Sequence, residues 1–352
     1  MSEIIKGVRQ MKGAQSIEFA APPYILESAC VCGNKEGEGP LKDTFDYIEE
    51  DSLFGCDTWE EAESALQEKT IDVLLEKSGY KKTDFRYIFA GDLMGQLIAT
   101  TFGILKFEIP LFGLYGACST MGEAISLASM TVAGGYANNV IAMASSHYAS
   151  AEKTFRFPLE YSTQRPYSAT WTVTGCGAVV IGNATNKSEK NMIKGKITGI
   201  TTGKIVDYGC KDSQNMGACM APAAADVIEQ NLIDFGYEPG EYDKIITGDL
   251  GYVGQTILID LLQRKGIEIT NNHMDCGIEI FDSEKQDTHA GGSGCGCSAT
   301  VLCGHILNNI KKGIWKKVLF VPTGALLSPT SFNEGQNVPG IAHAVMIEHP
   351  NK

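Results

Sequence analysis

Hydrophobic and polar positions follow two alternating patterns along the chain. A helical spacing of apolar residues runs over residues 58–78. Thr58 and Glu61 are placed as a capping box at its start, and Gly79 as a stop signal at its end. Compact apolar runs between such helices are typical of strands that helices cover on both faces. These runs predict strands at 110–114, 140–143, 177–181, 318–321 and 343–347.

The same series of elements occurs twice. The segment 89–93 (FAGDL) recurs as 246–250 (ITGDL), an offset of 249 − 92 = 157 residues. A helical segment precedes each copy, and the second is expected to open at Ala221-Pro222, with the proline in its first turn, and to close at Gly236. Strands that alternate with helices in two copies predict an α/β fold of two halves, 1–190 and 191–352.

Charge and cysteine content narrow the function classes. The 42 acidic and 29 basic side chains leave a net charge of −13, which argues against a nucleic-acid partner. The chain has no signal-peptide pattern and no apolar run long enough to span a bilayer. Its 11 cysteines therefore predict reduced thiols and synthesis in the cytoplasm, and their spacing predicts no metal site.

Cys118 is the first candidate for chemistry. It stands between the strand at 110–114 and a helix whose first turn contains Ser119 and Thr120. At such a position the free backbone N–H groups favour a thiolate, so we expect a lowered pKa and a nucleophilic sulfur. The same N–H groups could instead hold a ligand carboxylate. The simpler alternative is a small thiol packed beneath the helix.

Two histidines and two aspartates are further candidates. His147 follows a strand, at the end where ligand crevices form in α/β folds, and His273 lies in a turn-rich segment of the second half. Either could serve a thiol as a base, although a single histidine is more often structural. Asp92 and Asp249 end the repeated strands, where bonding of the following turn is the favoured interpretation.

A local basic cluster interrupts the acidic chain. Lys153, Arg156 and Arg165 lie close together in the segment 151–166. They could bind an anion if this loop overhangs the Cys118 crevice. The alternative is a solvated surface loop.

These motifs, in this order, resemble the thiolase superfamily and, more narrowly, the stage V sporulation protein AD family. The resemblance covers nearly the whole chain. It rests on long strings, among them GDLMGQ (91–96), GACST (116–120), SSHYASAEKTFRFPLEY (145–161), TGDLGYVG (247–254) and AGGSGCGCSA (290–299).

The resemblance implies a fold, a ligand and a cellular location. The fold is thiolase-like, with two duplicated α/β halves in a five-layer αβαβα arrangement. Members of the family bind dipicolinic acid and act in its movement into the developing endospore, with possible release in germination. They work with membrane proteins of the same sporulation operon and are peripheral components of the forespore or spore inner membrane. A homodimer is expected by analogy with thiolase-like proteins.

Departures from the condensing enzymes of the superfamily favour a binding protein. Cys118 matches their nucleophile, but His273-Met274-Asp275-Cys276 stands where a ketoacyl synthase would have a His-Gln-Ala-Asn-like segment. Gly292-Ser293 stands where Gly-Asn is expected, and the Gly-His-Pro of thiolases is absent. The alternatives are an active acyl-thioester transferase or ketoacyl synthase that uses Cys118, and a scaffold that docks to a membrane partner.

For a ligand with two carboxylates, the sequence suggests one binding position for each carboxylate. One carboxylate would lie at the helix start, and the other would meet a histidine, His147 or His273, or one of the three basic side chains of the segment 151–166. No cofactor is expected, although calcium could accompany dipicolinate as a chelate. The ligand-binding candidates are Asp92, Cys118, Ser119, Thr120, His147, Lys153, Arg156, Arg165 and His273.

Overall fold

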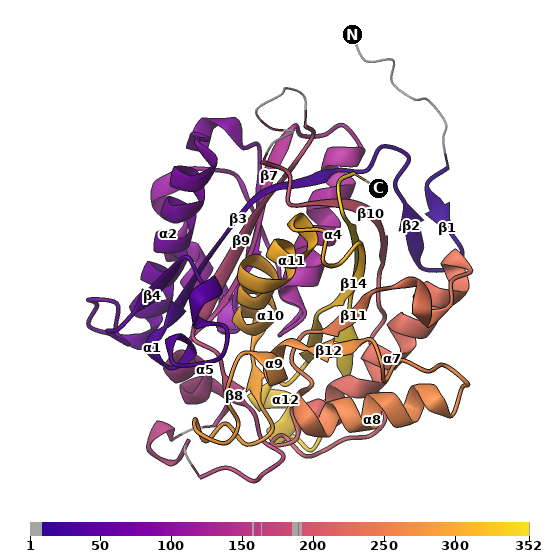
Figure 1. The fold of residues 1–352 in the computed structure, drawn as a ribbon. Coiled ribbons are helices and arrows are strands. Elements are labelled where there is room, and N and C mark those ends of the chain that lie inside the picture. The colour runs from indigo at the N-terminus through magenta and orange to yellow at the C-terminus, as the bar shows by residue number, and fades with distance from the viewer. Residues whose placement is uncertain (1–8, 157, 163, 185–188, 190–191, 352) are drawn as a thin grey trace.

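The computed structural model describes residues 9–156, 158–162, 164–184, 189 and 192–351. Within these residues one thirteen-stranded sheet carries the fold, and its main path runs in the order β12-β11-β14-β17-β10-β3-β9-β7-β5-β6 (Figure 1). The strands of this path are β3 (Tyr24–Gly33), β5 (Ile88–Gly91), β6 (Leu111–Gly113), β7 (Asn139–Ser146), β9 (Gly175–Gly182), β10 (Gly195–Thr201), β11 (Lys244–Thr247), β12 (His273–Asp275), β14 (Lys317–Val321) and β17 (Ala344–Glu348).

Short strands and helices complete the described part of the chain. The short strands are β1 (Met11–Lys12), β2 (Ser16–Glu18), β4 (Tyr47–Glu49), β8 (Trp171–Thr172), β13 (Gly292–Ser293), β15 (Thr323–Ala325) and β16 (Gly340–Ala342). The α-helices are α1 (Asn34–Gly37), α2 (Trp59–Ser78), α3 (Ile98–Gly103), α4 (Thr120–Ala133), α5 (Tyr148–Phe155), α7 (Met216–Phe235), α8 (Gly251–Gln263), α9 (Cys276–Glu279), α10 (Cys295–Val301), α11 (Leu307–Lys311) and α12 (Pro329–Asn333).

The strand order repeats, which confirms the duplication. The first half runs β3-β9-β7-β5-β6 and the second runs β10-β17-β14-β11-β12. In each half the first two pairings are antiparallel and the last two are parallel. The halves meet where β10 pairs with β3, through Gly195 opposite Ile25. The proposed boundary between residues 190 and 191 falls outside the described residues.

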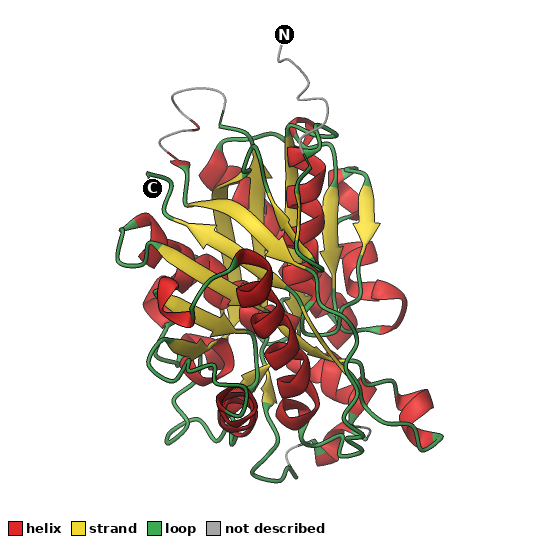
Figure 2. Cartoon of the chain, turned by 90° about the vertical axis from the view of Figure 1, so that its right-hand side faces the viewer, coloured by secondary structure: helices red, strands yellow, loops and turns green. Residues whose placement is uncertain are grey.

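Alternate residues of the strands face different helical layers. In β7, Ile141 and Met143 belong to the core beneath α2, whereas Val140 belongs to a central core that includes residues of α4 and α10. In β14, Phe320 faces that same central core and Leu319 faces the core of α7 and α8. Because strand side chains alternate between faces, the two half-sheets enclose a helical layer and carry another outside each. Figure 2 shows helices on both sides of the strands. The thiolase-like five-layer αβαβα arrangement is confirmed.

The helix signals in the sequence were right for both ends of α2 and for the end of α7 at Gly236, and wrong for the start of α7. Thr58 caps α2 by accepting from the backbone N of Glu61, and Gly79 ends it at φ 70°. Helix α7 begins at Met216 instead of Ala221, because Asn215 caps it earlier, and Pro222 lies inside the helix. None of the described helices is both long and apolar enough to cross a bilayer.

Candidate functional site

A tight turn between β6 and α4 presents the thiol of Cys118. Ala117, just before it, has a left-handed backbone with φ 50°. The Ser119 hydroxyl donates to the carbonyl of Gly116 at 2.7 Å, and the Thr120 hydroxyl donates to the carbonyl of Ala117 at 2.7 Å. Both hydroxyls therefore hold the turn, and neither residue lines the cavity that Cys118 faces. The half-buried thiol does line it.

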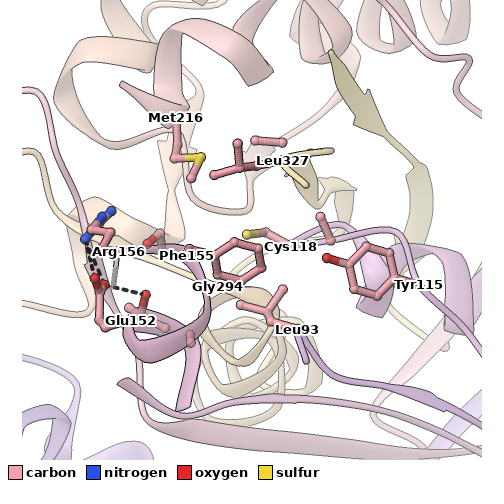
Figure 3. A pocket seen from close by; sticks show the side chains of 14 residues that line it. Leu93, Tyr115, Cys118, Glu152, Phe155, Arg156, Met216, Gly294 and Leu327 are labelled. Atoms are coloured by element: carbon pink, nitrogen blue, oxygen red, sulfur yellow. Dashed lines mark hydrogen bonds and ion pairs between the residues drawn. The ribbon is translucent and has the colours of Figure 1, made fainter. Parts of the chain in front are cut away.

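This cavity lies at the junction of the two halves and has a volume of about 40 Å³. Cys118 and Phe155 line it from the first half, and Met216, Gly294 and Leu327 line it from the second. Figure 3 shows the thiol and the Phe155 ring between an ion pair at one end and Tyr115 at the other. In this state it has room for water-sized guests.

A carboxyl group, and not a histidine, faces the thiol. Asp249, which follows β11, accepts from the Thr323 hydroxyl at 2.7 Å and from the backbone N of Gly294 at 3.0 Å. It also lies close enough to the Cys118 thiol for each group to shift the pKa of the other. Burial raises the pKa of Asp249 to about 7. None of the described histidines lines the cavity.

The thiol is therefore held in its neutral form. Burial, followed by the charge of Asp249, raises the pKa of Cys118 well above the usual range. The lowered pKa expected from the sequence is wrong. Helix α4 begins only at Thr120, two residues beyond the cysteine, and desolvation next to a carboxyl group outweighs the dipole of the helix.

A buried ion pair supplies the charge at the other end of the cavity. Arg156 donates from Nη1 to both carboxylate oxygens of Glu152, at 2.8 and 2.9 Å. The Glu152 carboxylate also accepts from the Thr172 hydroxyl. The Nε of Arg156 is buried and has no hydrogen-bond partner. One N–H group of this guanidinium thus lacks an acceptor, and it could donate to an anion that enters the cavity.

An apolar groove adjoins the cavity. Its volume is about 410 Å³, and it shares four wall residues with the cavity: Leu93, Tyr115, Phe155 and Leu327. On its far side Gln96 and Leu97 have left-handed backbones, with φ 58° and 54°. These shared side chains therefore form the boundary between the two spaces.

The two histidine candidates lie elsewhere. His147 caps α5 through Nδ1, contacts the carbonyl of Ser52 through Nε2 at 2.8 Å, and packs against Trp59. His273 contacts the Thr247 hydroxyl and the Gln255 amide, both at 3.0 Å. Burial lowers the pKa of His273 to about 4, so this ring is neutral at physiological pH.

The basic cluster is divided by the fold. Lys153 is exposed and pairs with Glu60 at 2.8 Å. Arg165 is buried over the ring of Trp171 and donates to the carbonyl of Asp287. Only Arg156 among the three lines the cavity.

Asp92 has the turn-bonding contacts that the sequence suggested for it. Its carboxylate accepts from the backbone N of Met94 and from both the backbone N and the hydroxyl of Thr100, at 2.6–2.8 Å. It is fully buried and lies outside the cavity lining, although the next residue, Leu93, belongs to that lining.

Sequence reasoning missed the partners of the thiol. Asp249 was assigned a turn-bonding role, and Glu152, Phe155 and Met216 were not singled out. The repeat offset marked Asp249 as the counterpart of Asp92, but a repeat does not say which copy faces a cavity. An acidic residue one turn before Arg156 was the available signal for a buried i,i+4 pair.

Comparisons with known proteins agree with this architecture. Residues 13–348 match the family of stage V sporulation protein AD (SpoVAD). The chain is 40% identical over 339 residues to stage V sporulation protein AD of Bacillus subtilis (strain 168), covering 96% of this chain and 98% of that protein. Among solved structures, acetyl-CoA acetyltransferase from Syntrophomonas wolfei is similar at a TM-score of 0.60 and 12% identity, covering 94% and 99% of the two chains. The 3-oxoacyl-[acyl-carrier-protein] synthase III from Aquifex aeolicus VF5 is similar at 0.54 and 13%, covering 93% and 99%. These two likenesses concern the fold alone.

Proposed function

Because the chain belongs to the stage V sporulation protein AD family, we propose that it is a non-catalytic thiolase-fold protein that binds dipicolinic acid in the Cys118 cavity. It would take part in the uptake of this ligand into the developing endospore, and possible release in germination would use the same site. The observation that carries the proposal is the contact between the Cys118 thiol and a carboxyl group, with a half-satisfied arginine in the cavity wall.

The contact with Asp249 supports the non-catalytic part. A cysteine nucleophile acts as the thiolate, and an adjacent base or cation normally stabilises that form. Here the neighbouring group is Asp249, whose negative charge opposes ionisation of Cys118. The thiol instead stays protonated in the cavity wall, where it could donate a hydrogen bond to a ligand.

Arg156 supports the binding of an anion. Its free Nε can donate to a ligand carboxylate, and the bond would be charge-assisted. The negative charges of Glu152 and Asp249 would repel a doubly charged ligand. Burial raises the pKa of both groups, which lessens this repulsion. Two forms of the ligand therefore fit: free dipicolinate beside a protonated Asp249, and a calcium chelate whose charge is neutralised.

Ligand entry requires the cavity to open. A volume of about 40 Å³ is too small for an aromatic ring, whereas the adjoining groove of about 410 Å³ is not. Rotation of Phe155 or Leu327 would connect the two spaces. The Phe155 ring would then lie beside the pyridine ring of the ligand, where aromatic rings attract one another in offset or edge-on contact.

Calorimetric titration tests the proposal directly. Dipicolinate, dipicolinate with calcium, and isophthalate, which keeps both carboxylates but lacks the ring nitrogen, are compared on the full chain. We expect selective binding of dipicolinate over isophthalate.

Glu152→Gln should strengthen binding of dipicolinate, because it frees Arg156, and Arg156→Gln should weaken it about tenfold. Lys153→Gln, an exposed matched control, should leave it unchanged. Equal affinities for the two ligands, or equal effects of Arg156→Gln and Lys153→Gln, would contradict the proposal.

An acyl-thioester transferase or ketoacyl synthase is the second candidate. It is favoured by the position of Cys118 in a cavity at the turn before α4, on a fold that acetyl-CoA acetyltransferase shares. Intact mass measured after incubation with acyl-coenzyme A separates the two functions. We expect no adduct. A stoichiometric acyl adduct that disappears in Cys118→Ala would establish the enzyme instead.

A homodimer is the proposed assembly. Strand β6 ends the path of the sheet, and the exposed side chains of Leu111 and Phe112 lie on it. Phe102 and Leu105 of the preceding segment are exposed as well. An apolar edge strand of this kind is suited to pairing with a second copy. Sedimentation should give a dimer at micromolar concentration and a monomer for Leu111→Glu, whereas Ile314→Glu, in the second half, should remain dimeric.

Association with membrane proteins of the same operon at the forespore or spore inner membrane is proposed from the family alone. The test is co-purification of the chain with the inner-membrane fraction of spores, and its loss when the operon partners are deleted. If the chain co-purifies but binds no small ligand, the docking scaffold becomes the better interpretation.

A further inference from the structure

Two cysteines outside the Cys118 cavity lie in direct contact. The sulfur atoms of Cys210 and Cys219 are 3.2 Å apart. Cys210 is in the connection between β10 and α7 and is half-buried, whereas Cys219 is buried in the first turns of α7. A protein disulfide has a sulfur–sulfur distance of about 2.0 Å, so a short movement of the side chains would join the pair.

The backbone on both sides of this contact is anchored. Cys210 accepts from the backbone N of Val338 at 2.8 Å, and Val206 exchanges two backbone hydrogen bonds with Gly340. At the other end, Asn215 caps α7 by accepting from the backbone N of Ala218 at 3.2 Å. The contact between the sulfurs therefore belongs to two fixed segments, which lowers the entropy that bond formation costs.

We propose that Cys210 and Cys219 form an oxidisable dithiol, which a small-molecule disulfide converts into an intramolecular disulfide bond. The half-buried Cys210 reacts first: its thiolate attacks one sulfur of the small disulfide, forms a mixed disulfide and releases one thiol. The Cys219 thiolate then attacks the sulfur of Cys210 and releases the second thiol. Overall, two protein thiols lose two protons and two electrons, and the small disulfide becomes two thiols.

The exposures of the two thiols support this order of attack. Burial, followed by the neighbouring Cys210, raises the pKa of Cys219, so that this thiol is a poor first nucleophile. Once Cys210 has formed the mixed disulfide, it no longer places an ionisable thiol beside Cys219. The Cys210 sulfur, which Cys219 must attack, already lies next to Cys219.

The bond would act on the wall of the Cys118 cavity. Met216, in the first turn of α7, lines that cavity and lies between the two cysteines in the sequence. Ala325, in β15, lines it too, and β15 pairs with β16, the strand that holds the Cys210 segment through Gly340. A disulfide would add a covalent link to the hydrogen bonds that already join these parts, so that oxidation of the pair strengthens one side of the cavity.

Peptide mapping of the full chain tests the proposal. The protein is incubated with oxidised glutathione, free thiols are blocked with iodoacetamide, and the sample is digested with trypsin without reduction. Lys211 lies between the two cysteines, so trypsin separates residues 205–211 from 212–244, each with one cysteine. We expect these peptides to be recovered joined and to separate after reduction. Cys210→Ser should abolish the joined species, and Cys56→Ser, at another half-buried cysteine, should leave it intact.

Thermal unfolding provides a second readout. A disulfide over 219 − 210 = 9 residues should raise the Tm of the oxidised wild type by a few degrees over the reduced protein, and Cys210→Ser should show no such shift. Recovery of the two peptides apart, glutathione retained on Cys210 alone, or a bond from either cysteine to a different one would each overturn the proposal.

Discussion

The two copies of Gly-Asp-Leu fold alike and are used differently. In the first half, the Asp92 carboxylate is occupied by the turn that follows it, through the backbone N of Met94 and both donors of Thr100. In the second half, Asp249 accepts from Thr323 and Gly294 and lies beside the Cys118 thiol, and none of these residues belongs to its own turn. One aspartate holds a loop, and the other reaches across the molecule to a thiol.

A third aspartate explains the difference. Asp275, at the end of β12, accepts from the backbone N of Leu250 and of Gly251, at 2.9 and 3.0 Å, and from the Thr247 hydroxyl at 2.6 Å. The Asp275 carboxylate, at the end of a neighbouring strand, therefore accepts the hydrogen bonds that hold the turn of the second copy. Asp249 is left available for the Cys118 thiol. A duplicated motif can thus acquire a new role when another residue takes over the structural one.

The largest expected effect concerns stability. Asp275→Ala should lower the free energy of unfolding by about 3 kcal/mol, since it leaves several buried donors without an acceptor. Asp92→Ala should cost a similar amount, for the same reason. Asp249→Asn should cost about 1 kcal/mol, because its amide oxygen still accepts from Gly294. Urea denaturation measures all three, and equal losses for Asp275→Ala and Asp249→Asn would remove the proposed division of roles.

The pH dependence of ligand binding should follow the second-half aspartate. Asp249 has a pKa of about 7, so it is protonated below that pH and becomes negative above it, beside the thiol that the anionic ligand would meet. Dipicolinate affinity should be level below pH 7 and fall about tenfold per unit above it, if only the protonated form binds. Calorimetry on Asp249→Asn should give a flat profile, and Asp92→Asn should keep the slope. A slope that survives in Asp249→Asn would assign it to another group.

Reactivity of the thiol gives a smaller effect. Asp249→Asn removes the charge that helps raise the pKa of Cys118, so more thiolate should be present at pH 8 and alkylation by iodoacetamide should be about fivefold faster. The rate can be followed on the tryptic peptide 107–153, in which Cys118 is the one cysteine. Asp92→Asn should leave the rate unchanged. Equal acceleration by both variants would point to a general loosening of the fold.

The smallest expected effect concerns a feature that the two halves share, the N-terminal caps of α2 and α7. Thr58 and Asn215 cap the corresponding helices α2 and α7, each by accepting one backbone N–H at 3.2 Å. Replacement of either residue by Ala should lower the free energy of unfolding by about 1 kcal/mol. Denaturation curves of the two variants should therefore coincide within error. A clear difference between them would show that the halves differ in stability as well as in function.

Local patterns made much of the fold predictable. The capped helix over 58–78 and the buried strands depend on neighbours in the sequence, and the repeat at an offset of 157 residues implied equivalent halves. The start of α7 was misjudged because Pro222 was taken as a first-turn signal, whereas the effective cap is Asn215. Both local signals were present, and Met220 and Ala221, which precede Pro222, are buried residues of the helix.

The candidate site was predictable only in part. Cys118 and Arg156 were recognised from the sequence and both line the cavity, whereas His147 and Lys153 were recognised and do not. The sequence by itself determined that two α/β copies would form and that Cys118 would lie in the turn before a helix. Only the tertiary structure decided that Asp249 faces Cys118, because that contact joins residues 131 positions apart (249 − 118) across the interface of the copies. It also decided the protonation of the thiol, since desolvation depends on everything packed around a group and not on the residues beside it in the chain.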